Sequence, residues 1–148
     1  MSRILNKAEI AALIPHAGQM CLLDAVLSWD STTITCVASS HRTGGNPLTA
    51  DGRLSAVCGV EYASQAMAVH GGLNGHGQRP AMGYLASLRD VVCSVEWLDS
   101  LEGDLVVTAE RLIADKARVI YHFALTCNGM PVLSGRAAVV VIDLERSV

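Results

Sequence analysis

Residues 54–69 have the sequence LSAVCGVEYASQAMAV, which is rich in alanine and contains no proline. Apolar residues fall on nearly every side of a helix drawn through this stretch, a pattern typical of a helix that is buried on most sides. Glycines are frequent between residues 71 and 77, and we expect them to end the helix in a loop. The sequence therefore predicts one long helix inside the fold, with the rest of the chain around it.

Stretches before and after this helix have the patterns of shorter elements. Residues 6–13 predict a short helix that ends before Pro15, and residues 32–38 predict a strand rich in β-branched residues. Alternating apolar and polar residues predict four more strands after the long helix, joined mostly by short turns. These strands include residues 91–97, 105–109, 119–125 and 137–141. This order predicts an α+β fold, an antiparallel sheet with one long buried helix, in a single domain of residues 1–148.

Composition and charge narrow the classes of function. The formal net charge is −3 and aromatic residues are 4% of the chain, so nothing indicates a nucleic-acid partner. The five cysteines are odd in number and form no CxxC pair, which favours reduced thiols over a disulfide framework or a zinc site. No apolar run approaches the roughly 20 residues of a membrane span, and the first residues lack the apolar core of a signal peptide. We expect a cytoplasmic protein without a metal site.

Three segments stand in an order that is informative. Residues 14–26 have the sequence IPHAGQMCLLDAV, residues 61–65 have EYASQ, and an alternating stretch from Val91 to Val95 is followed by EGDL at 102–105. Together they resemble the β-hydroxyacyl-acyl-carrier-protein dehydratases. The first is similar to that family's PHRxPFLLVDRV opening, the second to its E/D-x-x-x-Q element with the catalytic carboxylate, and the third to its strand–turn–strand with PGDxL.

The resemblance implies the hotdog fold, in which an antiparallel β-sheet wraps around one long central helix. It also implies dehydration of 3-hydroxyacyl-acyl-carrier-protein thioesters to trans-2-enoyl thioesters, in the biosynthesis of fatty acids or polyene-type lipids. One departure concerns the family's GHFPG loop, which places the catalytic histidine before the helix. Residues 44–48 are GGNPL and contain no histidine. In this respect the sequence looks like a divergent dehydratase-like subfamily associated with aryl-polyene lipids, with PH near the N-terminus and a GVEYAxQAMA helix.

Dehydration needs a base for the C2 proton, an acid for the departing C3 hydroxyl and donors for the charge on the thioester oxygen. If the fold brings His16 near Glu61, His16 replaces the missing histidine as the base, because neutral imidazole titrates near working pH. Glu61 is the candidate acid, because an apolar site favours the protonated form of a carboxyl group. Gln65 lies one turn later and is expected to position Glu61. The backbone amides of Gly59 and Val60 are candidate donors to the thioester oxygen, and Gly59 allows a ligand to approach closely.

Several assignments have alternatives. His41, in the loop before the helix, is the rival base to His16, and His16 alternatively has a structural role. Glu61 alternatively is a structural carboxylate bonded to backbone groups or to an arginine. Asn46 either shapes the turn that contains Pro47 or donates a hydrogen bond to the substrate.

The partners and the activity also leave alternatives. The expected partner is an acyl-carrier protein, which brings its own phosphopantetheine arm, so no separate cofactor is expected. A homodimer or a heterodimer with another hotdog subunit is expected as well. The alternative functions are an acyl thioesterase, in which Glu61 acts on the thioester carbonyl, and a non-catalytic partner subunit of a dehydratase heterodimer.

Overall fold

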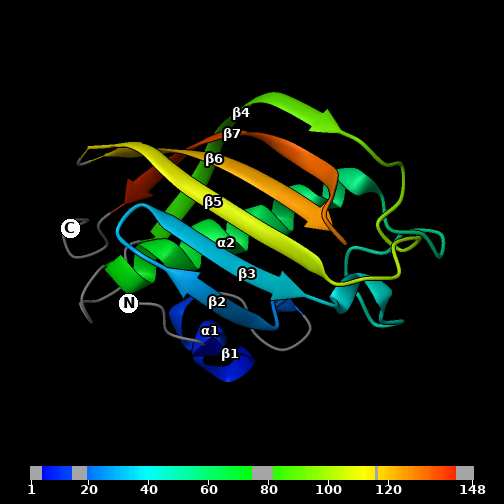
Figure 1. Ribbon diagram of the computed structural model, residues 1–148. Helices are drawn as coiled ribbons and strands as arrows, with labels where there is room; N and C mark the ends of the chain where they lie inside the picture. Colours follow the sequence, from blue (N-terminus) through cyan, green and yellow to red (C-terminus); the bar gives the residue numbers. More distant parts are fainter. Residues whose placement is uncertain (1–4, 15–19, 75–81, 116, 143–148) are drawn as a thin grey trace.

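A computed structural model describes residues 5–14, 20–74, 82–115 and 117–142 (Figure 1). The elements include two α-helices, two single-turn 3₁₀ helices (η2 and η3) and seven strands. In chain order they are β1 (Leu5–Asn6), α1 (Lys7–Leu13), β2 (Ala25–Trp29), β3 (Thr33–Ala38), η2 (Ser40–Arg42), η3 (Ala56–Cys58), α2 (Gly59–Asn74), β4 (Met82–Cys93), β5 (Leu105–Ala114), β6 (Arg118–Cys127) and β7 (Met130–Ile142).

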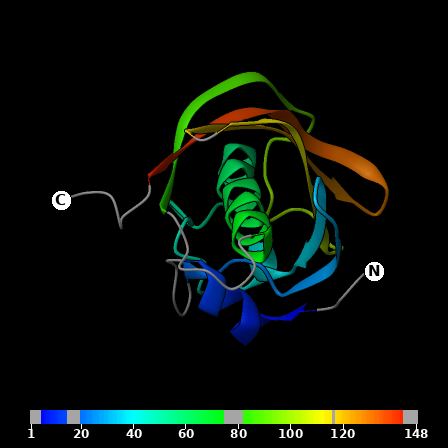
Figure 2. The ribbon, with the colours of Figure 1, turned by 90° about the vertical axis from the view of Figure 1, so that its left-hand side faces the viewer.

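All the strands belong to one antiparallel sheet with the order β1-β2-β3-β5-β6-β7-β4. The sheet curves, and α2 lies in its hollow; viewed along the helix, the strands arch over α2 while α1 lies on the opposite side (Figure 2). The helix packs mainly against β3, β5 and β6. The predicted α+β layout, a sheet wrapped around one long helix, is therefore present.

The alternating pattern of the later strands sets which side chains enter the core. In β5 the residues Leu105, Val107 and Ala109 are buried, while their neighbours are less covered. The same alternation in β6 buries Phe123 and Leu125. Because successive side chains point to opposite faces of a strand, one face of each strand meets α2.

The predicted strand at 91–97 is wrong in its position. The strand β4 begins at Met82 and ends at Cys93, and Trp97 lies beyond it, in an isolated bridge with Ser55. The side chains from Leu85 to Cys93 are all exposed, because α2 packs mainly against β3, β5 and β6 and leaves β4, the edge strand that pairs only with β7, largely uncovered. Alternation in this stretch therefore does not mark a buried face.

The predicted short helix is confirmed as α1, and its start is a capping box. The Asn6 side chain accepts the Glu9 backbone N–H at 2.9 Å, and the Glu9 carboxylate accepts the Asn6 N–H at 3.1 Å. These two bonds satisfy backbone donors that a helix start leaves without partners. The apolar side of α1 then packs against α2, with Ile10 fully buried.

The long helix α2 begins later and ends later than the predicted range of 54–69: residues 54–55 are not helical and residues 56–58 form η3. Its glycines at 71 and 72 remain helical, and the helix ends at Asn74. A Cβ atom at Gly72 would lie 3.4 Å from Leu13, so α1 packs closely against this end of α2. Tertiary packing therefore overrides the low helix propensity of the glycine pair.

A polar cluster fixes the C-terminal end of α2. His70 is fully buried; its Nε2 atom is 2.8 Å from the carbonyl oxygen of Asp30, and its Nδ1 atom is 2.7 Å from the Tyr121 hydroxyl. Because a carbonyl only accepts, Nε2 carries the proton, and Nδ1 accepts from Tyr121. Burial lowers the pKa of His70, which favours this neutral ring.

The structure also bears on the cysteines and on membrane-spanning helices. All five cysteines are free, and burial raises the pKa of the Cys36 thiol to about 12. Within the described ranges, no helix is both long and apolar enough to cross a membrane.

Candidate active site

Glu61 and Gln65 lie one turn apart near the beginning of α2, on the same side of the helix. Glu61 is half-buried and Gln65 is fully buried. The Gln65 Nε2 atom donates to the carbonyl oxygen of Met20 at 2.7 Å and to Glu61 Oε1 at 3.5 Å. The Gln65 Oε1 atom accepts the backbone N–H of Leu22 at 2.8 Å. The side-chain amide of Gln65 is thus fixed with its NH₂ group toward the Glu61 carboxyl group.

His16, the predicted base, lies outside the described residues, and its role stays a prediction. The described chain resumes at Met20, whose carbonyl oxygen is bound by Gln65. The segment that contains His16 is therefore joined in sequence to a residue held beside the turn of α2 that carries Glu61.

His41, the rival base, belongs to η2 and is only 2% exposed. Its Nε2 atom is 3.2 Å from the carbonyl oxygen of Leu101, and Nδ1 has no hydrogen-bond partner among the described residues. Burial lowers the pKa of His41, although the carbonyl oxygens of Gly103 and Leu101 oppose this shift. The next residue, Arg42, donates to the carbonyl oxygen of Glu102 at 2.9 Å. His41 is therefore held against the 101–104 loop.

Asn46 is buried, and its side chain serves the loop in which it lies. The Nδ2 atom donates to the carbonyl oxygen of Ser40 and to the Tyr62 hydroxyl, both at 3.0 Å. The Oδ1 atom accepts the Leu48 backbone N–H at 2.9 Å, as in an Asx turn. The sequence left two roles open for Asn46, shaping the turn or donating to the substrate. These hydrogen bonds within the loop correspond to the first role.

Two further polar residues were not predicted from the sequence. Tyr62 is fully buried, and its hydroxyl lies 2.8 Å from the Ser40 hydroxyl. Ser40 also donates to the carbonyl oxygen of Leu22 at 2.8 Å. A tyrosine in an apolar helix is usually a core residue, so the sequence did not indicate a polar role for Tyr62. Its hydrogen bond to Ser40, 22 positions earlier in the chain, is visible only in the folded structure.

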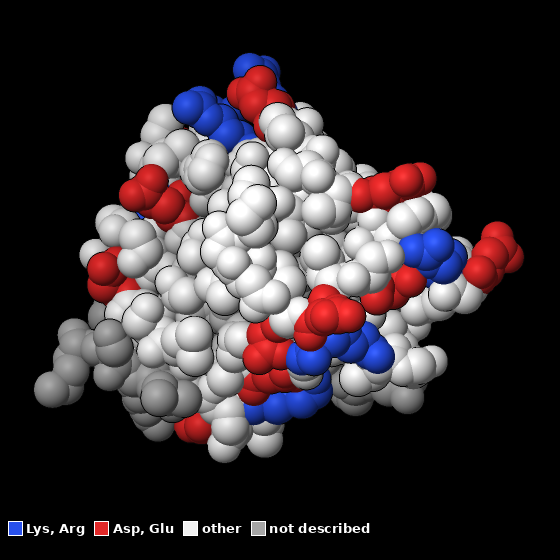
Figure 3. All heavy atoms as spheres, turned by 45° about the vertical axis from the view of Figure 1, so that its right-hand side comes forward, with Lys and Arg blue, Asp and Glu red and all other residues white. Residues whose placement is uncertain are grey.

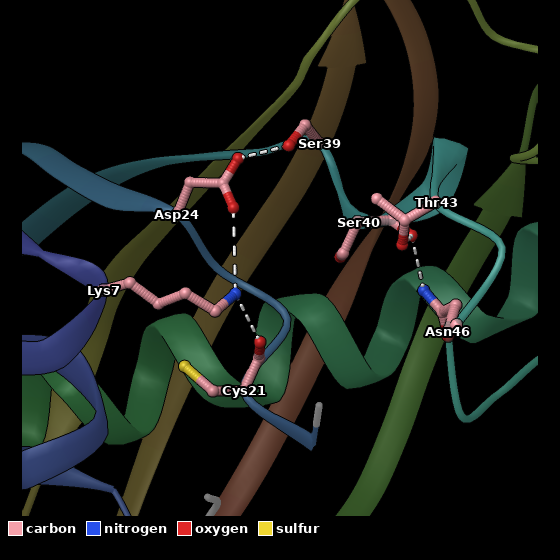
Figure 4. A pocket seen from close by; sticks show the side chains of 8 residues that line it. Lys7, Cys21, Asp24, Ser39, Ser40, Thr43 and Asn46 are labelled. Carbon is pink, nitrogen blue, oxygen red and sulfur yellow. Dashed lines mark hydrogen bonds and ion pairs between the residues drawn. The ribbon is translucent and has the colours of Figure 1, made fainter. Parts of the chain in front are cut away.

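A pocket of about 560 Å³ lies beside the 20–23 segment (Figure 4). On one side Lys7 Nζ donates to the carbonyl oxygen of Cys21 at 2.8 Å and lies 3.8 Å from an Asp24 carboxylate oxygen. The other carboxylate oxygen of Asp24 accepts from the Ser39 hydroxyl at 2.6 Å. The pocket is lined by Lys7, Cys21, Asp24, Ser39, Ser40, Thr43, Gly45 and Asn46. The 20–23 segment thus separates this pocket from the Gln65 side chain.

Gly59, predicted to meet the ligand, is buried under the sheet. A Cβ atom there would lie 2.7 Å from a methyl carbon of Leu133 and 3.0 Å from one of Leu125, so the glycine allows α2 to approach β6 and β7. Its N–H already donates to the carbonyl oxygens of the preceding 3₁₀ turn. Val60 is half-buried, and a role for its amide at the thioester oxygen stays a prediction.

The family follows from comparison with known proteins. Residues 8–147 match the sequence profile of the ApeP-like family, described as ApeP dehydratase. The chain belongs to the ApeP-like dehydratase family. No curated protein matches the sequence.

Solved structures show that this ApeP-like dehydratase has the hotdog fold. The dehydratase heterocomplex ApeI:P from Xenorhabdus doucetiae is 20% identical, covers 92% of each chain and has a TM-score of 0.80. A mutant thioesterase from Pseudomonas aeruginosa is 14% identical, covers 95% of this chain and 96% of the other, and has a TM-score of 0.64. A putative thioesterase from Silicibacter is 14% identical, covers 94% and 93%, and has a TM-score of 0.65. The predicted fold is confirmed.

Proposed function

We propose that this chain dehydrates 3-hydroxyacyl thioesters carried by an acyl-carrier protein to trans-2-enoyl thioesters. The observation that carries the proposal is the Glu61 carboxyl group, which an oriented Gln65 amide holds at the edge of an apolar core in a member of a dehydratase family. The phosphopantetheine arm comes with the carrier, and the proposed reaction uses no other cofactor.

In the proposed reaction His16 removes a proton from C2, and the electron pair of that C–H bond forms the C2–C3 double bond. The C3–O bond breaks, and the protonated Glu61 carboxyl group gives its proton to the departing hydroxyl, which leaves as water. His16 ends as imidazolium and Glu61 as carboxylate, and transfer of one proton from the histidine to the carboxylate restores both groups.

Chain connectivity supports the choice of His16 over His41. Four residues of extended chain span at most roughly 14 Å, and Met20 is bound by Gln65, one turn from Glu61. A histidine four positions before Met20 therefore has the reach to meet the same substrate as Glu61. His41, in contrast, bonds to the 101–104 loop through Leu101.

We also propose that a second hotdog subunit completes the working enzyme. The similar solved structure is a heterocomplex, and one edge of this sheet suits a protein contact. The side chains from Leu85 to Cys93 of β4 are exposed, and they include the apolar residues Leu85, Leu88, Val91 and Val92. Figure 3 shows a face of the molecule whose central area carries no charged side chains, with acidic and basic groups around it. Exposed apolar side chains that gather along one strand are typical of a protein interface.

A thioesterase is the second candidate, because two similar structures are thioesterases. In that reaction a water, activated by Glu61, attacks the thioester carbonyl carbon and releases the carrier thiol and a free acid. The two reactions act on different bonds, so their products separate the two candidates.

The test is turnover of a 3-hydroxyacyl-carrier thioester by the chain alone and together with a second hotdog subunit of the dehydratase type. Mass spectrometry follows loss of water, and a thiol reagent follows release of the carrier. Wild type, His16→Ala, Glu61→Gln and the exposed-carboxylate control Glu110→Gln are compared. Loss of water that only the first two substitutions abolish supports the dehydratase. Release of thiol without loss of water overturns it in favour of a thioesterase, and a chain that is inert even with its partner has no catalytic role.

A further inference from the structure

We propose that Tyr62 and Ser40 are positioning residues for Glu61 and act through one directional chain of hydrogen bonds. The inference rests on the proposed role of Glu61 as the acid. It begins from contacts that the sequence did not predict: Asn46, Tyr62 and Ser40 form a polar cluster against the apolar helix α2. Ser40 and Asn46 of this cluster line the pocket in Figure 4, where they lie near each other.

The direction of the first half of the chain follows from counting protons. A serine hydroxyl has one proton, and that of Ser40 is donated to the carbonyl oxygen of Leu22, which can only accept. The Tyr62 hydroxyl must therefore donate to Ser40 Oγ. Burial raises the pKa of Tyr62, so its hydroxyl keeps this proton. The Tyr62 oxygen is in turn left to accept from Asn46 Nδ2.

The second half begins at the other polar group of the same residue. The Leu22 N–H donates to Gln65 Oε1, which fixes which end of the side-chain amide is oxygen. The NH₂ end then donates to the carbonyl oxygen of Met20 and to Glu61 Oε1. The chain thus runs from Asn46 through Tyr62, Ser40, Leu22 and Gln65 to the Glu61 carboxyl group, and each donor in it has an acceptor.

Burial makes this arrangement stiff. Tyr62, Gln65 and Leu22 are each at most 1% exposed, so water has little access to the bond between Leu22 and Gln65, while Ser40 is half-buried at the pocket. The C=O and N–H of Leu22 belong to two different peptide units, so the two halves are coupled through the position of the Leu22 backbone: loss of the Ser40 bond releases Leu22, and the bond from Leu22 to Gln65 loosens with it. The 39–48 loop, which has no histidine where the related dehydratases place one, therefore supports the acid in place of supplying the base.

The experiment compares Tyr62→Phe and Ser40→Ala with the matched control Tyr121→Phe. Both tyrosines are buried and make a short hydrogen bond, but Tyr121 bonds to His70 at the far end of α2. Tyr62→Phe and Ser40→Ala are each expected to lower kcat roughly three- to tenfold with KM unchanged. The double variant is expected to be no slower than the slower single variant, because both changes break one chain. Tyr121→Phe is expected to keep kcat.

Equal kcat values for wild type and Tyr62→Phe overturn the inference, as does a multiplicative loss in the double variant. Hydrogen exchange of the Leu22 amide provides a readout without activity. The expected result is faster exchange at Leu22 in Tyr62→Phe but not in Tyr121→Phe, and unchanged exchange also overturns the inference. If the wild type itself does not dehydrate the substrate, the proposed function fails, and exchange at Leu22 decides by itself whether the chain is coupled.

Discussion

The two ends of α2 carry buried polar clusters that look alike in composition but differ in what they connect. Near the N-terminal end, Tyr62 bonds to Ser40 and Asn46, and the chain continues to the half-buried Glu61. Near the C-terminal end, His70 bonds to Tyr121 and to the backbone of Asp30. The first cluster leads to an ionisable group at the protein surface, whereas the second ties α2 to β6 and to the turn after β2.

This difference shows that a buried histidine with a shifted pKa is not by itself a sign of catalysis. His70 has the chemistry of an active-site base, but its ring nitrogens are occupied by structural partners. Glu61 has a less conspicuous environment, yet it is half-buried and accepts a hydrogen bond from an oriented amide. The two ends should therefore respond to mutation in opposite ways, one in activity and the other in stability.

The largest expected effect is on activity, at the N-terminal end. Glu61→Gln keeps the size of the side chain but removes the acid, so kcat should fall by about 10²–10⁴, the usual contribution of a general acid. The free energy of unfolding should change by less than about 1 kcal/mol, because Glu61 is only half-buried. Steady-state kinetics and urea unfolding measure the two quantities. A large loss of stability with unchanged kcat would reverse the comparison.

The next effect is on stability, at the C-terminal end. His70→Leu leaves the Tyr121 hydroxyl and the Asp30 carbonyl oxygen without their buried partner. Such losses cost about 2–3 kcal/mol of unfolding free energy, while kcat should stay within twofold of wild type. His122→Leu, on the exposed face of β6, is the matched control. A His70→Leu variant that is stable but inactive would contradict this assignment, because it would mean that the catalytic base lies at the C-terminal end of α2.

Two glycines sharpen the comparison in terms of packing. Gly59→Ala puts a methyl group 2.7 Å from Leu133 and should cost about 2 kcal/mol of stability through overcrowding. Gly72→Ala meets Leu13 at an ordinary 3.4 Å, so the gain of up to about 1 kcal/mol in helix propensity should offset any crowding. Thermal or urea unfolding of both variants tests this. Equal effects at both sites would mean that the sheet does not press on the N-terminal end more closely than α1 presses on the other.

The smallest expected effect is the change in the free energy of unfolding with pH. Burial holds the pKa values of His70 and His41 below 6.5 in the folded protein, so the unfolded chain takes up protons first as the pH falls. The unfolding free energy should therefore be highest above about pH 7 and should fall as the pH drops through 6.5, by at most about 1.4 kcal/mol per pH unit for each histidine. Urea unfolding from pH 5 to 8 measures the slope. In His70→Leu the slope should be reduced, and an unchanged slope would contradict the assignment.

The sequence predicted helices and strands best where a local pattern of apolar residues corresponds to a single buried face. Apolar residues around the helix at 54–69 and the alternation at 105–109 and 119–125 correspond to α2, β5 and β6. The prediction failed where a distant element decides the outcome. Packing of Leu13 against Gly72 extends α2 past its first glycines, and β4 lies outside the strands that α2 mainly covers, which leaves an alternating stretch exposed.

The candidate site divides in the same way. The i, i+4 spacing alone predicted that Gln65 meets Glu61, and the structure contains that bond. The contact between Tyr62 and Ser40 depends on the path of the 39–48 loop, which no local periodicity encodes. His16 lies outside the described residues, so its part in the site stays a prediction from the sequence.

The two edges of the sheet have a consequence for how large an assembly can grow. The edge at β1 is two residues long and runs directly into α1, whereas the edge at β4 is twelve residues long. A sheet with one long edge strand can pair with one other chain through that edge. Once two such edges pair, neither chain has a long edge left for a third chain. Pairing through β4, if it occurs, would therefore use the one long edge that the described sheet offers in each chain, and it would favour a closed pair over a fibre.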